Sequence, residues 1–170
     1  MPIATTDLLI RLAGGSSNTD PNASLGGVMS TSTTVVDNTT HNLFDQVDGT
    51  ESNAGDTEYR SVYLLNNHGS LTAQNTKVYI SSNTPSADTD ISIGLAAEGA
   101  NATMATIANE NTAPATVTFS QPTTYAGGLS MGNLTAGQRY GLWIKRVVNA
   151  GAAAVNDDAV TIKYDCDTAA

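Results

Sequence analysis

The segment EYRSVYLLN, Glu58–Asn66, decides the fold class of this chain. In an extended strand, Val62 and Leu64 fall on one face, whereas Tyr63 and Leu65 fall on the other. A strand that is apolar on both faces is typical of a central strand or of a strand that faces a partner. The segment therefore indicates a β protein in which this strand is covered on both sides.

Alternation with a period of two continues on either side of this segment, and each run places apolar residues on one face. The runs contain Val78 and Ile80, then Ile91, Ile93 and Leu95, then Tyr140, Leu142 and Ile144, and finally Val160, Ile162 and Tyr164. Turn signals such as Asn66–Gly69 and Asn83–Ser86 separate the runs. The stretch nearest to a helical pattern, Ala96–Ala108, contains Gly99 and several threonines, which favour a loop. The pattern predicts an all-β, antiparallel β-sandwich of the jelly-roll or immunoglobulin-like type.

The N-terminal quarter has a different composition. Ile3–Leu12 is a candidate strand, and the Gly-, Ser-, Asn- and Pro-rich linker Ala13–Ser24 follows it. Two interpretations remain open at this point. The segment is either an arm that adds to another sheet edge or chain, or a first strand followed by a long loop. We divide the chain into an N-terminal arm and linker, residues 1–32, and a β-sandwich domain, residues 33–170.

Composition excludes several classes of function. The chain has 170 residues, 14% of them charged, and a formal net charge of −9. An acidic surface argues against nucleic acid and against an anionic membrane as partners. The N-terminus lacks the pattern of a secretory signal, so synthesis as a soluble cytosolic protein is expected. The single cysteine, Cys166, excludes an intrachain disulfide framework.

Candidate catalytic groups are few. His41 and His68 both lie in Asn-rich, turn-like contexts, and no G-x-S-x-G motif occurs. We expect neither an enzyme nor a cofactor. The densest run of charge is the acidic stretch Asp45–Glu58, which does not fit the spacing of a calcium loop. A solvated loop with Arg60 as its counter-charge is the favoured interpretation, and bound Ca²⁺ stays open as the alternative.

Trp143 lies on the face of its strand opposite to the predicted core residues. It is a candidate anchor for a sugar or a protein partner, or else the second face of the sheet packs inside the molecule. Because Leu142–Val148 (LWIKRVV) is too apolar for a fully exposed face, an oligomer interface is favoured.

Two longer stretches carry a resemblance to a known class of proteins. They are GDTEYRSVYLLNNHGSLTAQNTKVYISSNTPSADTDISIGLAAEG, Gly55–Gly99, and LTAGQRYGLWIKRVVNAGAAA, Leu134–Ala154. Together they resemble small structural proteins of tailed-bacteriophage virions, most closely the decoration or cement proteins of the capsid. The opening DLLIRLAGG and SLGG segments belong to the same resemblance, which covers about two-thirds of the chain.

The resemblance implies a non-enzymatic protein on the outer surface of a phage head, made in the host cytoplasm, that stabilises the shell by bridging capsid subunits. It implies the major capsid protein as partner and a homo-oligomer, with a trimer favoured. Candidate partner-binding residues are Ile3, Leu8, Ile10 and Leu12 of the arm, and Trp143, Lys145 and Arg146. The alternative is a tail- or fibre-associated sandwich that binds host glycans through Trp143 or Tyr125.

Overall fold

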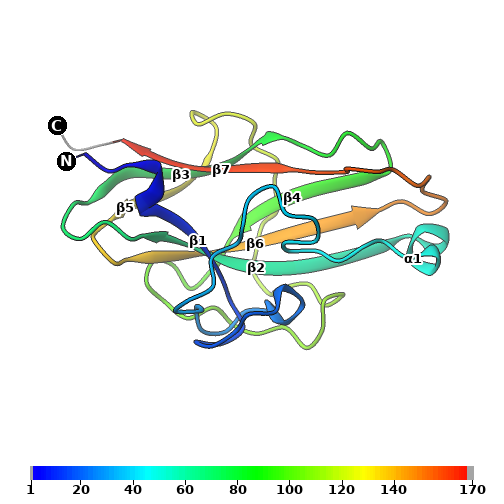
Figure 1. Cartoon of the computed structure of the whole chain (residues 1–170), viewed down its shortest axis with the longest axis horizontal. Coiled ribbons are helices and arrows are strands. Elements are labelled where there is room, and N and C mark those ends of the chain that lie inside the picture. Colours follow the sequence, from blue (N-terminus) through cyan, green and yellow to red (C-terminus); the bar gives the residue numbers. More distant parts are fainter. Residues whose placement is uncertain (1, 168–170) are drawn as a thin grey trace.

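The structure is a computed structural model that describes residues 2–167, and it contains two antiparallel sheets packed face to face (Figure 1). The four-stranded sheet has the order β1-β2-β6-β4, and the three-stranded sheet has the order β5-β3-β7. The strands are β1 (Leu8–Leu12), β2 (Asp56–Asn66), β3 (Ala73–Ser82), β4 (Thr89–Leu95), β5 (Leu129–Leu134), β6 (Arg139–Val148) and β7 (Thr161–Asp167). The prediction of an antiparallel β-sandwich is confirmed.

In the described residues, helical structure is limited to short pieces on either side of β1 and before β2. Two 3₁₀ turns, η1 (Thr5–Asp7) and η2 (Pro21–Ala23), flank β1, and the short helix α1 (Gly49–Ala54) precedes β2. None of the helices in the described part of the chain is long and apolar enough to span a membrane.

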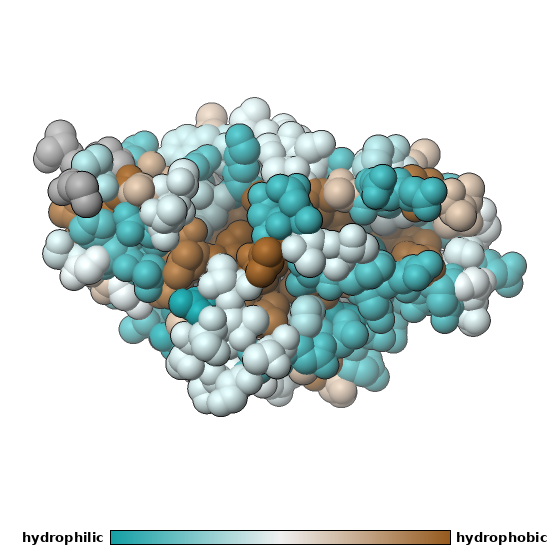
Figure 2. Space-filling view, in the orientation of Figure 1, coloured by the Kyte–Doolittle hydropathy of each residue, from teal (hydrophilic) through white to brown (hydrophobic). Residues whose placement is uncertain are grey.

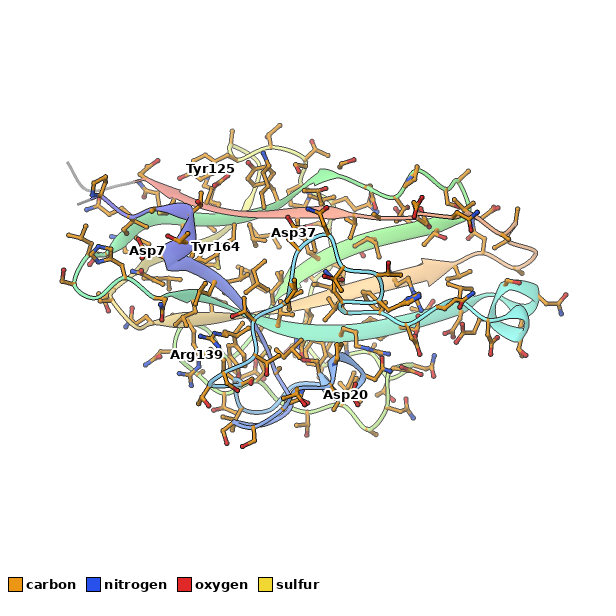
Figure 3. All side chains as sticks on the ribbon, viewed as in Figure 1. Asp7, Asp20, Asp37, Tyr125, Arg139 and Tyr164 are labelled. Carbon is orange, nitrogen blue, oxygen red and sulfur yellow. The ribbon has the colours of Figure 1, made fainter. Side chains whose placement is uncertain are left out.

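Strand β2 is central, as its sequence predicts. It lies between β1 and β6, and it is buried without interruption from Glu58 to Asn66. Val62 and Leu64 pair with Leu142 and Tyr140 of β6, and these four residues face the second sheet. The other side of the core comes from the three-stranded sheet, which contributes Val78, Ile80, Met131, Leu134 and Tyr164. In Figure 3, Tyr164 extends from β7 toward the other sheet, whereas Tyr125 lies on the opposite, outer side of the three-stranded sheet.

A layer of loops covers the outer face of the four-stranded sheet and forms a second core. Tyr59, Tyr63 and Trp143 point into this layer and pack against Ala13, Ala96 and Met104. In Figure 1 the loops lie on the side of β2 and β6 that faces away from β7. Trp143 is only 2% exposed, so the second apolar face packs inside this chain. The apolar character of Leu142–Val148 predicts an oligomer interface for this face, but in the structure loops of the same chain cover it.

Hydroxyl groups on β2 tie the loop layer to the sheet. The Tyr63 hydroxyl accepts a hydrogen bond from the Met104 amide (2.8 Å) and donates one to the Gly27 carbonyl (2.7 Å). Two residues before Tyr63 in β2, the Ser61 hydroxyl donates to the Ser24 carbonyl (2.9 Å) and accepts from the Gly26 amide (2.7 Å). Gly26 has φ +89°, and a Cβ there would meet the Ala105 carbonyl oxygen at 2.0 Å, so this close approach requires glycine.

The structure does not confirm a separate N-terminal arm. Leu8–Leu12 pairs antiparallel with Asn66–Val62, so the segment is the first strand of the four-stranded sheet. The linker after it enters the loop layer, where Ala13 is fully buried and its amide donates to the Ser24 hydroxyl (2.8 Å). Of the two interpretations that the sequence left open, the chain adopts the strand with a long loop.

Replacement of Leu12 by alanine tests whether β1 belongs to the fold. Leu12 is 2% exposed and lies in the core between the sheets, so Leu12→Ala should lower the free energy of unfolding by about 2–5 kcal/mol. Urea unfolding measures the change. Val36→Ala is the matched control, because Val36 is 62% exposed and its truncation should cost little. Equal losses of unfolding free energy in the two variants would mean that β1 does not contribute to the stability of the fold.

Replacement of Tyr63 by phenylalanine tests the loop layer. The change keeps the ring but leaves the Met104 amide and the Gly27 carbonyl without their partner, at a cost of about 1–3 kcal/mol. Tyr79→Phe is the control, because the Tyr79 hydroxyl bonds to Asp165 on the outer face of the other sheet. Thermal or urea unfolding should separate the two variants, and a neutral Tyr63→Phe would contradict a hydrogen-bonded loop layer.

Candidate functional site

The predicted partner-binding residues do not come together at one site in the structure. Ile3 and Leu12 are buried in the core between the sheets, and Leu8 and Ile10 are half-buried against it. Figure 2 shows hydrophobic atoms reaching the surface in the middle of the face on which β1 and β7 lie. Leu8 and Ile10 keep part of their surface exposed, whereas Ile3 and Leu12 are buried and contribute to folding.

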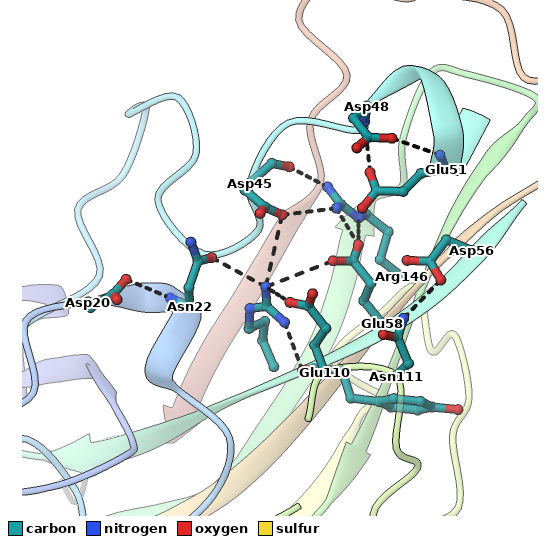
Figure 4. A network of polar contacts seen from close by, with 12 residues as sticks. Asp20, Asn22, Asp45, Asp48, Glu51, Asp56, Glu58, Glu110, Asn111 and Arg146 are labelled. Carbon is teal, nitrogen blue, oxygen red and sulfur yellow. Dashed lines mark hydrogen bonds and ion pairs between the residues drawn. The ribbon is translucent and has the colours of Figure 1, made fainter. Parts of the chain in front are cut away.

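The predicted residues of β6 are also engaged within the chain. Trp143 is covered by the loop layer, and Lys145 is half-buried with its ammonium 5.7 Å from the centre of the Phe119 ring. Arg146 is buried and belongs to a network of charges at the α1 end of the sandwich. This network is the densest concentration of charged side chains inside the described molecule (Figure 4).

Arg60 is one centre of the network, and its side chain is completely buried. It forms an ion pair with Glu110, which lies on a loop fifty residues further along the chain, and its guanidinium also contacts Asn22 (3.2 Å). Glu58 (3.8 Å) and Asp45 (3.9 Å) complete its surroundings. Arg60 thus joins β2 to three segments that are distant in sequence.

Arg146 of β6 is the second centre. It pairs with Glu58, the residue opposite it in the β2–β6 register, and its Nη1 donates to the Asp45 carbonyl (2.7 Å). The ring of Phe44 is shared by both cations, since its centre is 4.8 Å from the Arg146 guanidinium and 5.5 Å from that of Arg60. Contacts of this kind stabilise desolvated guanidinium groups by about 2 kcal/mol or more. Residues 44–45 are therefore held against the sandwich by hydrogen bonds and ion pairs of Asp45 and by cation–π contacts of Phe44.

Glu58 is the most constrained acid of the network. Burial raises the pKa of Glu58, whereas Arg146, and to a smaller extent Arg60, favour its charged form. Its Oε1 is buried and has no hydrogen-bond donor, and its closest cation is Arg60. Glu58 thus depends on both arginines, and the loss of either leaves a buried carboxylate with one cation.

The acidic stretch that left Ca²⁺ open adopts a definite structure. Glu51, Asp56 and Glu58 bring one oxygen each within 4.8 Å of one another. Each of these carboxylates already has a partner from the chain, because Glu51 accepts from the Asp48 amide, Asp56 from the Asn111 amide group and Glu58 from Arg146. Fixed protein donors therefore give the acids a role in the fold that needs no cation.

Local sequence explains how the network is positioned. Asp48 caps α1 by accepting from the amides of Thr50 (2.7 Å) and Glu51 (2.8 Å), and Glu51 closes a reciprocal capping box. The signal D-G-T-E at Asp48–Glu51 was available in the sequence, where we expected a loop. Arg60 was expected as the counter-charge of this stretch, but in solvent. No periodic signal identified Glu110 as its partner.

Two hollows lie away from the network. One, of about 200 Å³, lies beside Trp143 and is lined by Glu98, Ala105–Ala108, Thr112–Ala115 and Val117. The other, of about 230 Å³, lies beside Leu12 and is lined mainly by Thr33–Val36, His41 and Asn42. Glu98 in the first hollow accepts from the Ala105 amide (3.0 Å), so its carboxylate fixes the loop layer. The arrangement of charges in this protein fastens loops to sheets.

Replacement of Arg60 by methionine tests that role. The variant removes the cation shared by Glu58, Glu110 and Asp45, so we expect a loss of about 3–5 kcal/mol of unfolding free energy. Amide hydrogen exchange should also accelerate selectively around Asn22, Asp45 and Glu110. Lys145→Met is the control, because the described residues include no ion-pair partner of Lys145. Unchanged exchange in these loops would contradict the fastening role.

Comparison with known proteins does not assign this network or the fold around it to a family. No protein-family model, curated protein or solved structure matches the chain. The function is therefore inferred from the sequence and from the geometry described above.

Proposed function

We propose that this chain is a non-enzymatic structural protein of a tailed-bacteriophage virion, a decoration or cement protein on the outer surface of the head. In this role it is made in the host cytoplasm, binds the major capsid protein as a homo-oligomer, and bridges neighbouring capsid subunits. The proposal starts from the resemblance carried by Gly55–Gly99 and Leu134–Ala154.

The observation that carries the proposal is the fastening of long loops to the sandwich. Residues 13–30 and 96–119 are held by the Ser61 and Tyr63 hydroxyls, and residues 44–45 and 110 by the two buried arginines. A protein that transmits load between capsid subunits must resist deformation. Buried polar contacts give that resistance because breaking them leaves desolvated groups without partners.

The surface chemistry favours many small contacts over one strong contact. Only 14% of residues are charged, so hydroxyl and amide groups cover much of the exterior. A stable protein–protein interface of standard size buries about 1,600 Å² in total. Repetition over a capsid lattice allows smaller contacts to act together through avidity. Leu8, Ile10 and Lys145 remain half-exposed and are our candidates for part of such a contact.

The burial of Trp143 weighs against the glycan-binding alternative. A sugar can stack on this ring only if the loop layer moves away. Tyr125 is half-exposed, but its hydroxyl donates to the Asn75 carbonyl (2.7 Å) and the Lys77 ammonium lies 5.1 Å from its ring centre. The chain itself therefore already occupies both aromatic groups.

Purified virions that contain this protein test the proposal directly. Electron cryomicroscopy should show its density at repeated positions on the outside of the head. Particles that lack the protein should release DNA at a lower temperature, measured with a DNA-binding dye, and added protein should restore the release temperature. Density confined to the tail, or heads of equal thermal stability with and without the protein, would refute a cement role.

A further inference from the structure

The edges of the two sheets are not equally protected. The outer edge of β1 is covered, because Val35 donates to the Ile10 carbonyl (2.8 Å) and Leu12 donates to the Thr33 carbonyl (3.2 Å). The outer edge of β4 is bridged at Ile93, which exchanges two hydrogen bonds of 2.9 Å with Ser120. Both edges of the four-stranded sheet are therefore closed by segments of the same chain.

In the three-stranded sheet, β5 and β7 are the edge strands (Figure 1). The pairing of β5 is interrupted by a register shift at Gly132, and bulges of this kind discourage addition of a further strand. Strand β7 pairs with β3 in continuous register from Ile162 to Asp165, and its register shifts lie outside this stretch, on either side of it. Within residues 2–167, only β3 hydrogen-bonds to the backbone of β7. An open and regular edge is a template for another strand.

The sequence of this edge is complementary to itself. The strand reads Thr161-Ile-Lys-Tyr-Asp-Cys-Asp167, with Lys163 and Asp165 placed symmetrically about Tyr164. Two copies paired antiparallel about Tyr164 place Lys163 opposite the partner's Asp165, and Asp165 opposite the partner's Lys163. The same register places Ile162 opposite the partner's Cys166. Side chains directly opposite one another lie close enough to interact.

The free chain leaves these groups ready for such pairing. Lys163 is exposed, and no ion pair or hydrogen bond reaches its ammonium from the described residues. Asp165 accepts one hydrogen bond, from the Tyr79 hydroxyl (2.8 Å), which leaves acceptor capacity on its carboxylate. On the inner face, Val160, Ile162 and Cys166 pack against the core but stay partly exposed. A second copy would neutralise the outer face and cover the inner one.

We propose that β7 is a homodimerisation edge, at which two copies pair antiparallel about Tyr164 and form one six-stranded sheet. Dimerisation at β7 does not depend on the proposed function. In a cement protein it would add a two-fold contact between copies to the contacts that each copy makes with the capsid. It differs from the trimer that the resemblance implies, and both contacts can occur in one assembly. An edge lysine can also serve to prevent strand addition, and the experiments below separate the two roles.

Cysteine cross-linking tests the register. Ile162→Cys places a thiol opposite the partner's Cys166, so mild oxidation of the full chain should give a covalent dimer that reductant reverses. The wild-type chain should not cross-link, because its two Cys166 residues would be four residues apart along the strands, about 13 Å, and a disulfide spans at most ~7 Å between Cα atoms. Ser81→Cys, exposed on β3, is the control for random collision. Equal cross-linking of Ile162→Cys and Ser81→Cys would overturn the proposal.

Charge exchange tests the pairing without a covalent bond. Lys163→Glu and Asp165→Lys each place like charges opposite one another at two symmetric positions, so each should weaken dimerisation about tenfold or more in sedimentation equilibrium. The double variant restores opposite charges and should restore dimerisation. Circular dichroism checks that all variants are folded. A wild-type monomer, a wild-type trimer without Ile162→Cys cross-links, or a double variant no better than the single ones would each overturn the proposal.

Discussion

Burial of β2 on both faces is the constraint on which the rest of this structure depends. The second sheet covers one face, but a sandwich of two sheets leaves the other to solvent. Here irregular loops cover it, and loop backbone that is buried needs partners for its amide and carbonyl groups. Ser61 and Tyr63 supply those partners from within an otherwise apolar strand. The polar residues of β2 are therefore the points at which the loop layer is attached.

The ion network meets a similar requirement at the Asp56 end of β2. Strand β1 pairs only with Val62–Asn66, so the edge of β2 from Asp56 to Ser61 has no neighbouring strand on that side. Loops close this edge, since the Tyr59 amide donates to the Glu110 carbonyl (2.7 Å) and Arg60 pairs with the side chain of the same glutamate. Buried ion pairs add stability only when charges and hydrogen bonds are nearly complete. The shared acids and the Phe44 ring meet most of that requirement.

The elements that could be predicted from the sequence are those whose structure follows from a local period. Alternation located β3, β4, β6 and β7, and the two-faced run at Glu58–Asn66 predicted a central strand. Contacts between residues distant in sequence could not be predicted in this way. The cover of Trp143 comes from irregular loops that show no period, and Glu110 lies fifty residues from Arg60. The edge chosen by β1 was also undetermined, because an arm and a first strand have the same alternation.

Because β1 is a strand of the sandwich and not a separate arm, the proposed cement function would depend on the folded module. A flexible arm could bind the shell by itself, but a strand built into the sandwich requires the folded module to make the contacts. The half-exposed surface of Leu8 and Ile10 alone is small, so strong attachment has to come from several modules acting together. Copies linked through an open sheet edge meet that requirement, because binding of one copy raises the effective concentration of the next at the neighbouring site. In a cement protein whose copies pair at β7, this edge and the fastened loops would act together, since rigid and linked modules lose little entropy when they bind a lattice.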